Sequence, residues 1–346
     1  MALFNVGGVD QGGRHRVEHM RRAFVELVQE RVSILGDCAT GTRLHLQSPL
    51  GTDDQLGLVP LVDDDLGATA IRAVSMGYAA TAAEFGLPFV IDAPTWWARS
   101  DRLARHGING DAAKALVRRC VEVVLPVRDR FDDVYVSAPM GPSTDGYRAG
   151  DVDVDQAIEY HRWHAEQLAA TDADVLVAGT FSTANDLEAV ARVLSATDRP
   201  YVLGPNVHAT GCLPDGTALH HVIDSIESTV TRLPSHWGLW CTHPEVALSA
   251  MEIVGTADPH AHRRVQQLKG NGTTASIEER ECADHVLCDE PEPWALAAMR
   301  LHDEHGVSIV GGCCGTDDRH LLSLAIRLAA ISRHDSVGDS KSGAPE

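Results

Sequence analysis

Two adjacent cysteines, Cys313 and Cys314, are the residues of this sequence best suited to chemistry. They lie between glycines in the stretch 310–316. Adjacent cysteines rarely bridge each other without strain, and glycine neighbours let a ligand approach the backbone closely. A strand-like run precedes the pair at 307–309, and an apolar-periodic run follows it at 317–330. The pair is therefore predicted to lie on a strand-to-helix turn and to bind a metal ion.

Cys241 is a third thiol in a similar position, because it ends a predicted strand at residues 236–241. If the strands form a closed parallel barrel, the residues at their carboxyl ends meet around one rim. Three thiolates from Cys241, Cys313 and Cys314 suit a zinc ion, and a fourth position open to substrate is typical of a catalytic site. The alternative is that these thiols are small hydrophobic side chains in a core.

The elements that would position these thiols alternate along the whole chain. Strands are predicted at residues 32–36, 87–91, 132–137, 174–178, 200–203, 236–241 and 307–309, with one more between 254 and 276. Helices are predicted at 17–31, 68–85, 110–127, 154–170, 184–194, 218–230, 291–305 and 317–330, and after residue 245. Eight such alternations, with no dinucleotide-binding glycine fingerprint, favour a single α/β domain, a (β/α)8 TIM-type barrel.

Composition and charge narrow the setting. Residues 1–334 are expected to form one barrel, with a lead helix within 1–30 and a flexible tail rich in Ser and Gly at 335–346. The net charge of −20 would repel nucleic acids and anionic membranes. No apolar run is long enough to span a bilayer, and the start is not signal-like. Eight cysteines in such a chain indicate free thiols in a reducing, cytoplasmic compartment.

Three motifs together resemble the homocysteine S-methyltransferase family. They are Gly-Asp-Cys-Ala-Thr-Gly-Thr at 36–42, Gly-Leu-Trp-Cys-Thr-His-Pro-Glu at 238–245 and Gly-Gly-Cys-Cys-Gly-Thr at 311–316. The resemblance extends over about residues 30 to 332. It implies a zinc-dependent barrel that moves a methyl group onto a thiol. It also implies that Cys241, Cys313 and Cys314 bind the zinc, while Asp37 helps to hold the amino acid.

The sequence also departs from the family pattern. Family members usually carry Phe-Glu-Thr at the end of strand four, where this chain has Ala-Gly-Thr with Gly179 in the middle. The usual Asn before the first zinc cysteine is Trp240, and the usual Gly after the first aspartate is Cys38. These changes leave the predicted metal site intact and alter the homocysteine pocket. The methyl acceptor could therefore be a different thiol or selenol.

The expected activity is zinc-dependent S-methyl transfer to a thiol, with homocysteine giving methionine as the first expectation. A free thiol with a pKa near ~8.5 is mostly protonated at neutral pH, and coordination to a dication deprotonates it. No catalytic residue is expected beyond the zinc centre. A cationic small-molecule donor, of the S-methylmethionine or S-adenosylmethionine type, becomes neutral when it loses its methyl group. The open alternative is a non-catalytic barrel that binds a thiol, and monomers and homo-oligomers are both open.

Residues at predicted strand ends are the candidates for binding substrate. They are Asp37, Cys38, Thr95, Trp96, Trp97, Gly179, Trp240 and Asn271. The tryptophans could attract the cationic donor with their ring faces or cap the barrel core. Asn271 resembles a polar position that the family keeps after strand seven.

Other polar residues are expected to matter less. His161 and His164 could face one metal ion, but their helix should coat the barrel, so we expect them to be solvated. His208 follows strand five and is either a substrate contact or ordinary loop polarity. The remaining thiols that fall in predicted helices or connections are expected to pack in the core; they are Cys120, Cys282 and Cys288.

Overall fold

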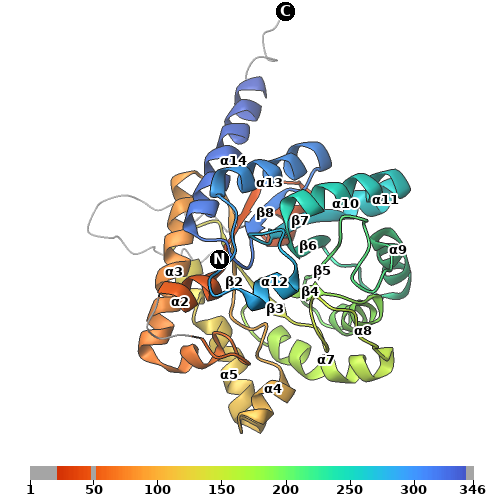
Figure 1. Cartoon of the computed structure of the whole chain (residues 1–346). Coiled ribbons are helices and arrows are strands. Elements are labelled where there is room, and N and C mark those ends of the chain that lie inside the picture. The colour runs from red at the N-terminus through yellow and green to blue at the C-terminus, as the bar shows by residue number, and fades with distance from the viewer. Residues whose placement is uncertain (1–21, 48–51, 340–346) are drawn as a thin grey trace, which may run out of the picture.

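A closed barrel of eight parallel strands forms the centre of the protein (Figure 1). The computed structural model describes residues 22–47 and 52–339. The strands are β1 (Ile34–Gly36), β2 (Phe89–Asp92), β3 (Val134–Met140), β4 (Val175–Phe181), β5 (Tyr201–Pro205), β6 (His236–Thr242), β7 (Val265–Gly270) and β8 (Ile309–Gly312). They follow one another around the barrel in chain order, and β8 closes it by pairing with β1. The predicted (β/α)8 fold is confirmed.

Helices surround the strands (Figure 1). They are α1 (Phe24–Gln29), α2 (Thr40–Gln47), α3 (Asp65–Glu84), α4 (Ser100–Arg105), α5 (Gly110–Glu122), α6 (Leu125–Arg128), α7 (Val154–Ala169), α8 (Ala184–Ser195), α9 (Leu219–Thr229), α10 (Pro244–Ala257), α11 (Pro259–Arg264), α12 (Ile277–Cys282), α13 (Pro291–His305) and α14 (Asp318–Asp339), with a 3-10 helix η1 (Val59–Asp63). Within the described residues, no helix is both long and apolar enough to cross a membrane.

Local signals explain several helix boundaries. Helix α13 begins at Pro291, whose fixed φ suits a first helical position, and ends before Gly306, which adopts the left-handed conformation with φ 69°. The predicted single helix 110–127 is two helices instead. Helix α5 ends at Glu122, four residues before Pro126, because a proline removes a hydrogen bond and clashes with the carbonyl four residues earlier.

Several strands differ from the predicted ranges for reasons that lie in their residues. Strand β3 runs on to Met140 through a proline, and β4 runs on to Phe181 through Gly179, although both residue types usually interrupt strands. Strand β7 could not be placed from sequence because its polar residues, Gln266, Gln267 and Lys269, are buried. Polar residues in a fully buried strand conceal the apolar run that identifies one.

Two predictions outside the barrel interior need correction. His161 and His164 are buried on α7, with only 1% and 3% of their surface exposed, so the expectation that they are solvated was wrong. His161 packs against α8, where its Nε2 is 2.7 Å from Asp186 Oδ1. At the C-terminus, α14 continues to Asp339, past residue 335 where the tail was predicted to begin. Residues 1–21, in the predicted lead, and 340–346 lie outside the described residues.

Candidate active site and metal centre

Three cysteine sulfurs meet at the carboxyl end of the barrel. Cys241 is near the end of β6, and Cys313 and Cys314 follow β8. The Cys241 Sγ atom lies 2.7 Å from that of Cys313 and 3.5 Å from that of Cys314, and the sulfurs of the adjacent pair are 3.9 Å apart. The structure therefore brings together the three thiols predicted to bind a metal ion.

The donor set fits a tetrahedral metal ion. Zinc–sulfur bonds of about 2.3 Å in a tetrahedron place neighbouring sulfurs about 3.8 Å apart. The two longer sulfur–sulfur distances, 3.5 and 3.9 Å, suit that geometry, and the 2.7 Å distance between Cys241 and Cys313 would have to lengthen. Burial raises the pKa of the Cys241 thiol to about 12, so this thiol needs a nearby cation to ionise at neutral pH. The cluster could thus hold a metal ion.

Side chains from other loops donate hydrogen bonds to the sulfur of Cys241. The Tyr147 hydroxyl donates to it at 3.0 Å and lies 3.7 Å from Cys314 Sγ. Asn271 Nδ2 donates to the same sulfur at 3.4 Å. Tyr147 was not predicted, because it lies in a polar loop after β3 where no pattern marks it. The loop is turned toward the thiols by Asp145, whose side chain accepts from the backbone N–H groups of Tyr147 and Arg148 at 2.7 and 3.0 Å.

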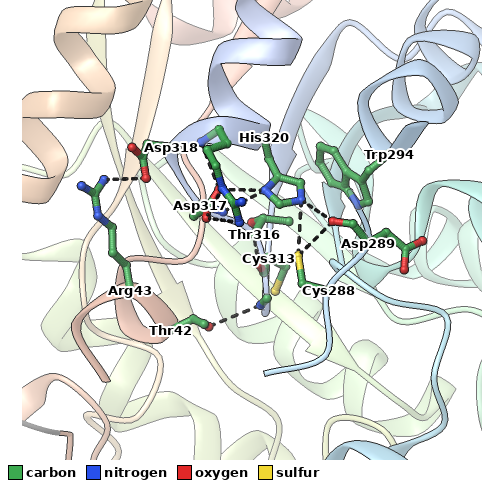
Figure 2. Close-up of polar contacts among 12 residues, drawn as sticks. Thr42, Arg43, Cys288, Asp289, Trp294, Cys313, Thr316, Asp317, Asp318 and His320 are labelled. Atoms are coloured by element: carbon green, nitrogen blue, oxygen red, sulfur yellow. Dashed lines mark hydrogen bonds and ion pairs between the residues drawn. The ribbon is translucent and has the colours of Figure 1, made fainter. Parts of the chain in front are cut away.

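A buried histidine supports the turn that carries Cys313 and Cys314 (Figure 2). His320 of α14 lies 2.9 Å from Asp317 Oδ1 through Nδ1, and its Nε2 lies 3.2 Å from the Asp289 carbonyl and 3.3 Å from Cys288 Sγ. The Thr316 hydroxyl donates to the Cys313 carbonyl at 2.7 Å. The imidazole therefore ties the segment after α12 to the first residues after the double-cysteine turn.

The thiols outside this cluster lie in different environments. Cys120 is fully buried on α5, as expected. Cys282 is exposed at the end of α12 and Cys288 is half-buried, so the expectation of core packing was wrong for Cys282 and only partly met for Cys288. All eight cysteines lie in the described residues, and none of them forms a disulfide there.

A cavity of about 810 Å³ opens beside the sulfurs. Of the predicted residues, Asp37, Cys38, Trp96, Trp97, Trp240, Cys313 and Cys314 line it. Helix α12, which lies in front of the barrel strands in Figure 1, contributes Arg280 and Glu281 to the wall.

Three predicted substrate residues are not part of the cavity wall. Thr95 is buried and donates to the Pro139 carbonyl at 2.6 Å, so it joins two strand ends. Asn271 reaches the Cys241 sulfur, and Gly179 lies beneath the indole of Trp240. His208 is exposed and also lies outside the lining, which fits ordinary loop polarity.

A buried lysine that the sequence did not single out offsets part of the negative charge on the floor of the cavity. Lys269 of β7 is 6% exposed and forms ion pairs with Asp37 and, at 2.5 Å, with Asp92. Burial raises the pKa of Asp37 to about 7, although the Lys269 ammonium opposes that rise. Burial alone would lower the pKa of Lys269, but Asp37 and Asp92 hold it above its usual value. Asp37, which the family resemblance predicted to help hold the substrate amino acid, therefore binds the ammonium of Lys269.

Trp240 and Gly179 depend on each other. A Cβ atom at Gly179 would lie 2.4 Å from a ring carbon of Trp240, and one at Gly204 would lie 2.3 Å from another. The indole thus covers two backbone segments that must lack side chains. The two differences from the family pattern seen in the sequence, Trp240 and Gly179, are one structural change: the indole fills the space that a side chain at residue 179 would need.

The other tryptophans form an aromatic wall. The rings of Trp96 and Trp97 meet edge to face with centroids 4.3 Å apart. The guanidinium carbon of Arg102 lies 3.9 Å from the ring centroid of Trp97, so one protein cation already covers a face of that ring. Trp96 donates from Nε1 to the Gly179 carbonyl at 2.8 Å. The Lys269 ammonium lies 5.6 Å from the ring centroid of Trp240, so that ring also faces a protein cation. Trp96 is therefore the better candidate for contact with a cationic ligand.

Comparison with known proteins agrees with this fold. Solved structures of the Escherichia coli homocysteine methyltransferase MmuM are similar to the chain. The oxidized form is 21% identical with a TM-score of 0.68, covering 87% of this chain and 97% of that one. The metallated form is 20% identical with a TM-score of 0.66, covering 87% and 98%. A search of curated proteins found no match.

The model of the family described as homocysteine S-methyltransferase matches residues 34–328. Because that match covers most of the sequence and includes all three thiols of the cluster, the chain belongs to the homocysteine S-methyltransferase family and is a methyltransferase.

Proposed function

We propose that this protein is a zinc-dependent S-methyltransferase that moves a methyl group from a cationic small-molecule donor to a thiol. The observation that carries the proposal is the cluster of three sulfurs beside a cavity with aromatic walls. Three thiolates and an open fourth position suit catalytic zinc. The similar E. coli protein has been solved in a metallated form, which supports a metal in this site as well.

The acceptor thiol is the nucleophile in this proposal. When bound, zinc would supply a dication that lowers the pKa of the thiol and keeps its sulfur as a thiolate at neutral pH. Cys241, Cys313 and Cys314 would hold the ion. The hydroxyl of Tyr147 and the amide of Asn271 donate to the Cys241 sulfur and orient it.

The donor is proposed to be a sulfonium of the S-methylmethionine or S-adenosylmethionine type. The acceptor sulfur attacks the methyl carbon, a new carbon–sulfur bond forms, and the bond to the donor sulfur breaks. The electron pair of the broken bond stays on the donor sulfur, so the donor leaves as a neutral thioether. The proton of the acceptor thiol has already been released to solvent. The face of Trp96 would attract the cationic donor, an effect of ~1–2 kcal/mol when desolvated.

Homocysteine, which would give methionine, is the first acceptor to test because of the family to which the chain belongs. A different thiol is the second candidate, and it is favoured because the buried carboxylates of the cavity, Asp37 and Asp92, already pair with Lys269. We also propose a reducing, cytoplasmic compartment, in keeping with the eight free cysteines of the described residues.

Metal analysis combined with a product assay tests the proposal. The wild type should hold about one zinc per chain and methylate a thiol, detected by mass spectrometry. Cys313→Ser should lose both, whereas Cys212→Ser, a control in the loop after β5, should keep both. A full zinc complement in Cys313→Ser would contradict the metal site. Zinc and thiol binding without a methylated product from any donor would favour a non-catalytic thiol-binding barrel.

A further inference from the structure

The buried carboxylates of the cavity are already occupied by groups of the protein. Asp37 pairs with Lys269 through Oδ1 and accepts from the Asp92 backbone N–H through Oδ2 at 3.1 Å. Asp92 pairs with Lys269 through Oδ2 and accepts from the Ser137 hydroxyl through Oδ1. Each of these four oxygens therefore has a donor from the chain. A substrate ammonium placed here would have to displace one of these donors, and the Lys269 ammonium beside it would weaken its attraction to the carboxylates.

The carboxylates nearer the mouth of the cavity are occupied too. Glu281 of α12 makes two bonds with Arg148, at 3.0 and 2.8 Å. Asp145 accepts from two backbone N–H groups, and its second oxygen lies 3.5 Å from Arg148. The wall beside Trp240 cannot add a carboxylate, because the indole leaves no room for a side chain at Gly179. Among the described residues that line the cavity, every carboxylate therefore already has a partner, and none is free to pair with an incoming ammonium.

Two cations of the cavity wall, Arg102 and Arg280, lack a carboxylate partner among the described residues. Arg102 covers the Trp97 ring and donates to the Gln55 carbonyl, which leaves Arg280 as the cation beside the sulfurs. In the described part of the chain, no carboxylate lies within ion-pairing distance of its guanidinium, and its buried Nε has no hydrogen-bond partner. The guanidinium carbon lies 5.0 Å from the ring centroid of Tyr147, whose hydroxyl is 3.0 Å from the Cys241 sulfur. Arg280 and Cys314 also line a second hollow of about 340 Å³ together. The positive charge of Arg280 therefore lies close enough to the three sulfurs for one small substrate to contact both.

We propose that the methyl acceptor is a thiol carboxylate without an α-ammonium group, bound through its carboxylate to Arg280. This proposal rests on the proposed function and narrows it. Burying an ammonium without a carboxylate partner is costly, whereas an arginine and a carboxylate form paired, charge-assisted hydrogen bonds. Trp240 supplies an apolar surface for the methylene groups between the two ends of such an acceptor.

A matched pair of thiols isolates the ammonium group. L-Homocysteine and 4-mercaptobutanoate share the thiol, the chain length and the carboxylate, and they differ in the amino group. We would titrate each into the cobalt(II)-loaded protein and follow the sulfur-to-cobalt charge-transfer absorption, which reports thiol binding without any donor. The ratio kcat/KM for each thiol with S-methylmethionine and S-adenosylmethionine would follow.

The proposal predicts that 4-mercaptobutanoate binds at least about tenfold more tightly than homocysteine and is methylated at a higher kcat/KM. Arg280→Gln should weaken its binding about 10- to 100-fold, the range expected for a lost hydrogen-bonded charge pair, and Arg280→Lys should restore part of it. The control Arg300→Gln, on α13 and paired with Glu304 outside the cavity, should bind as the wild type does.

Two kinds of result would overturn the inference, and they differ in what they imply. If homocysteine binds as tightly as 4-mercaptobutanoate or more tightly, or if Arg280→Gln changes nothing, the acceptor assignment fails and the proposed thiol methyl transfer stands. If neither thiol changes the cobalt spectrum, both the acceptor assignment and the proposed thiol methyl transfer fail. Metal content and circular dichroism of Arg280→Gln, expected to match the wild type, separate lost binding from lost folding.

Discussion

Replacing Lys269 with methionine would leave two carboxylates buried without their shared cation. Lys269 is 6% exposed and reaches both Asp37 and Asp92. Methionine has a similar length and no charge, so the change removes the ammonium and keeps most of the packing volume. Removing one partner of a buried ion pair typically costs about 3–5 kcal/mol of unfolding free energy. We expect a loss in this range at pH 8.

The loss should depend on pH, with a sign that follows from Asp37. Burial raises the pKa of this carboxyl from 3.8 to about 7 in the folded chain. A group with a raised pKa binds protons in the folded state that the unfolded state has released, so stability falls as the pH rises from about 4 to about 7. The pKa of about 7 already includes the opposing effect of Lys269, whose own contribution to stability is fully present below pH 10.5. Without the ammonium, the pKa of Asp37 rises further, and the variant should regain about 1.4 kcal/mol per pH unit on acidification.

Urea unfolding of zinc-loaded protein at pH 5 and pH 8, followed by circular dichroism, measures both effects. Lys114→Met is the control, since Lys114 forms an exposed pair with Asp111 on α5 that should contribute less than about 1 kcal/mol. The reasoning is refuted if Lys269→Met is as stable as the control at pH 8. It is also refuted if the variant loses more stability at pH 5 than at pH 8, because the carboxylates would then not be the cause.

Two further predictions concern packing and the metal site. Gly179→Glu should lower the thermal midpoint, since its Cβ would lie 2.4 Å from the Trp240 ring. Trp240→Asn should lower it as well, because the cavity left by the indole costs about 3–5 kcal/mol of unfolding free energy. The thermal midpoint of the double variant should fall by less than the sum of the two single falls. Differential scanning calorimetry of the three variants measures this, and additive falls would show that the contact between residues 179 and 240 does not matter. His320→Asn should weaken zinc binding about 10- to 100-fold by loosening the turn that carries Cys313. Competition with a chromogenic chelator measures that affinity. An unchanged value would show that the turn keeps its geometry without His320.

The barrel and the convergence of the three thiols could be predicted from the sequence, because both depend on local patterns. Cys241 ends an apolar run and the Cys313–Cys314 pair follows another, and a closed parallel barrel places such positions on one rim. The α7 histidines could also have been placed correctly. His161 and His164 share helical spacing with Ala157, Ala165 and Leu168, and all of these are buried on one face of α7.

Lys269 and Tyr147 could not be found in this way. Lysine is almost never fully buried without a partner, and the partners of Lys269 are 232 and 177 residues away in the sequence, on β1 and β2. No local pattern reports such a pairing. Tyr147 lies in a loop of Asp, Gly and Arg residues, and only the turn made by Asp145 directs its hydroxyl to Cys241. Long-range charge pairing and loop geometry are thus what the sequence pattern leaves undetermined.

Irregular backbone explains how Trp240 and Cys241 can both serve the site. In a regular strand, neighbouring side chains point to opposite faces, so one of the two would point away from the barrel. The pairing of β6 with β7 shifts register between Trp240 and Thr242, and Cys241 adopts a left-handed conformation with φ 56°. Strand β4, whose Gly179 contacts Trp240, has a similar irregularity. Its pairing with β5 shifts register between Gly179 and Phe181, and Thr180 has a left-handed φ of 62°.

Bulges of this kind redirect side chains next to functional sites, and a left-handed non-glycine residue costs about 1–3 kcal/mol. Both bulges lie where Trp240 rests on Gly179. The bulge in β6 lets the indole cover the cavity floor while the next residue presents its sulfur to the cluster. The strain at Cys241 and Thr180 is therefore linked to both halves of the site, because a strand without the bulge could supply the metal ligand or the apolar floor, but not both.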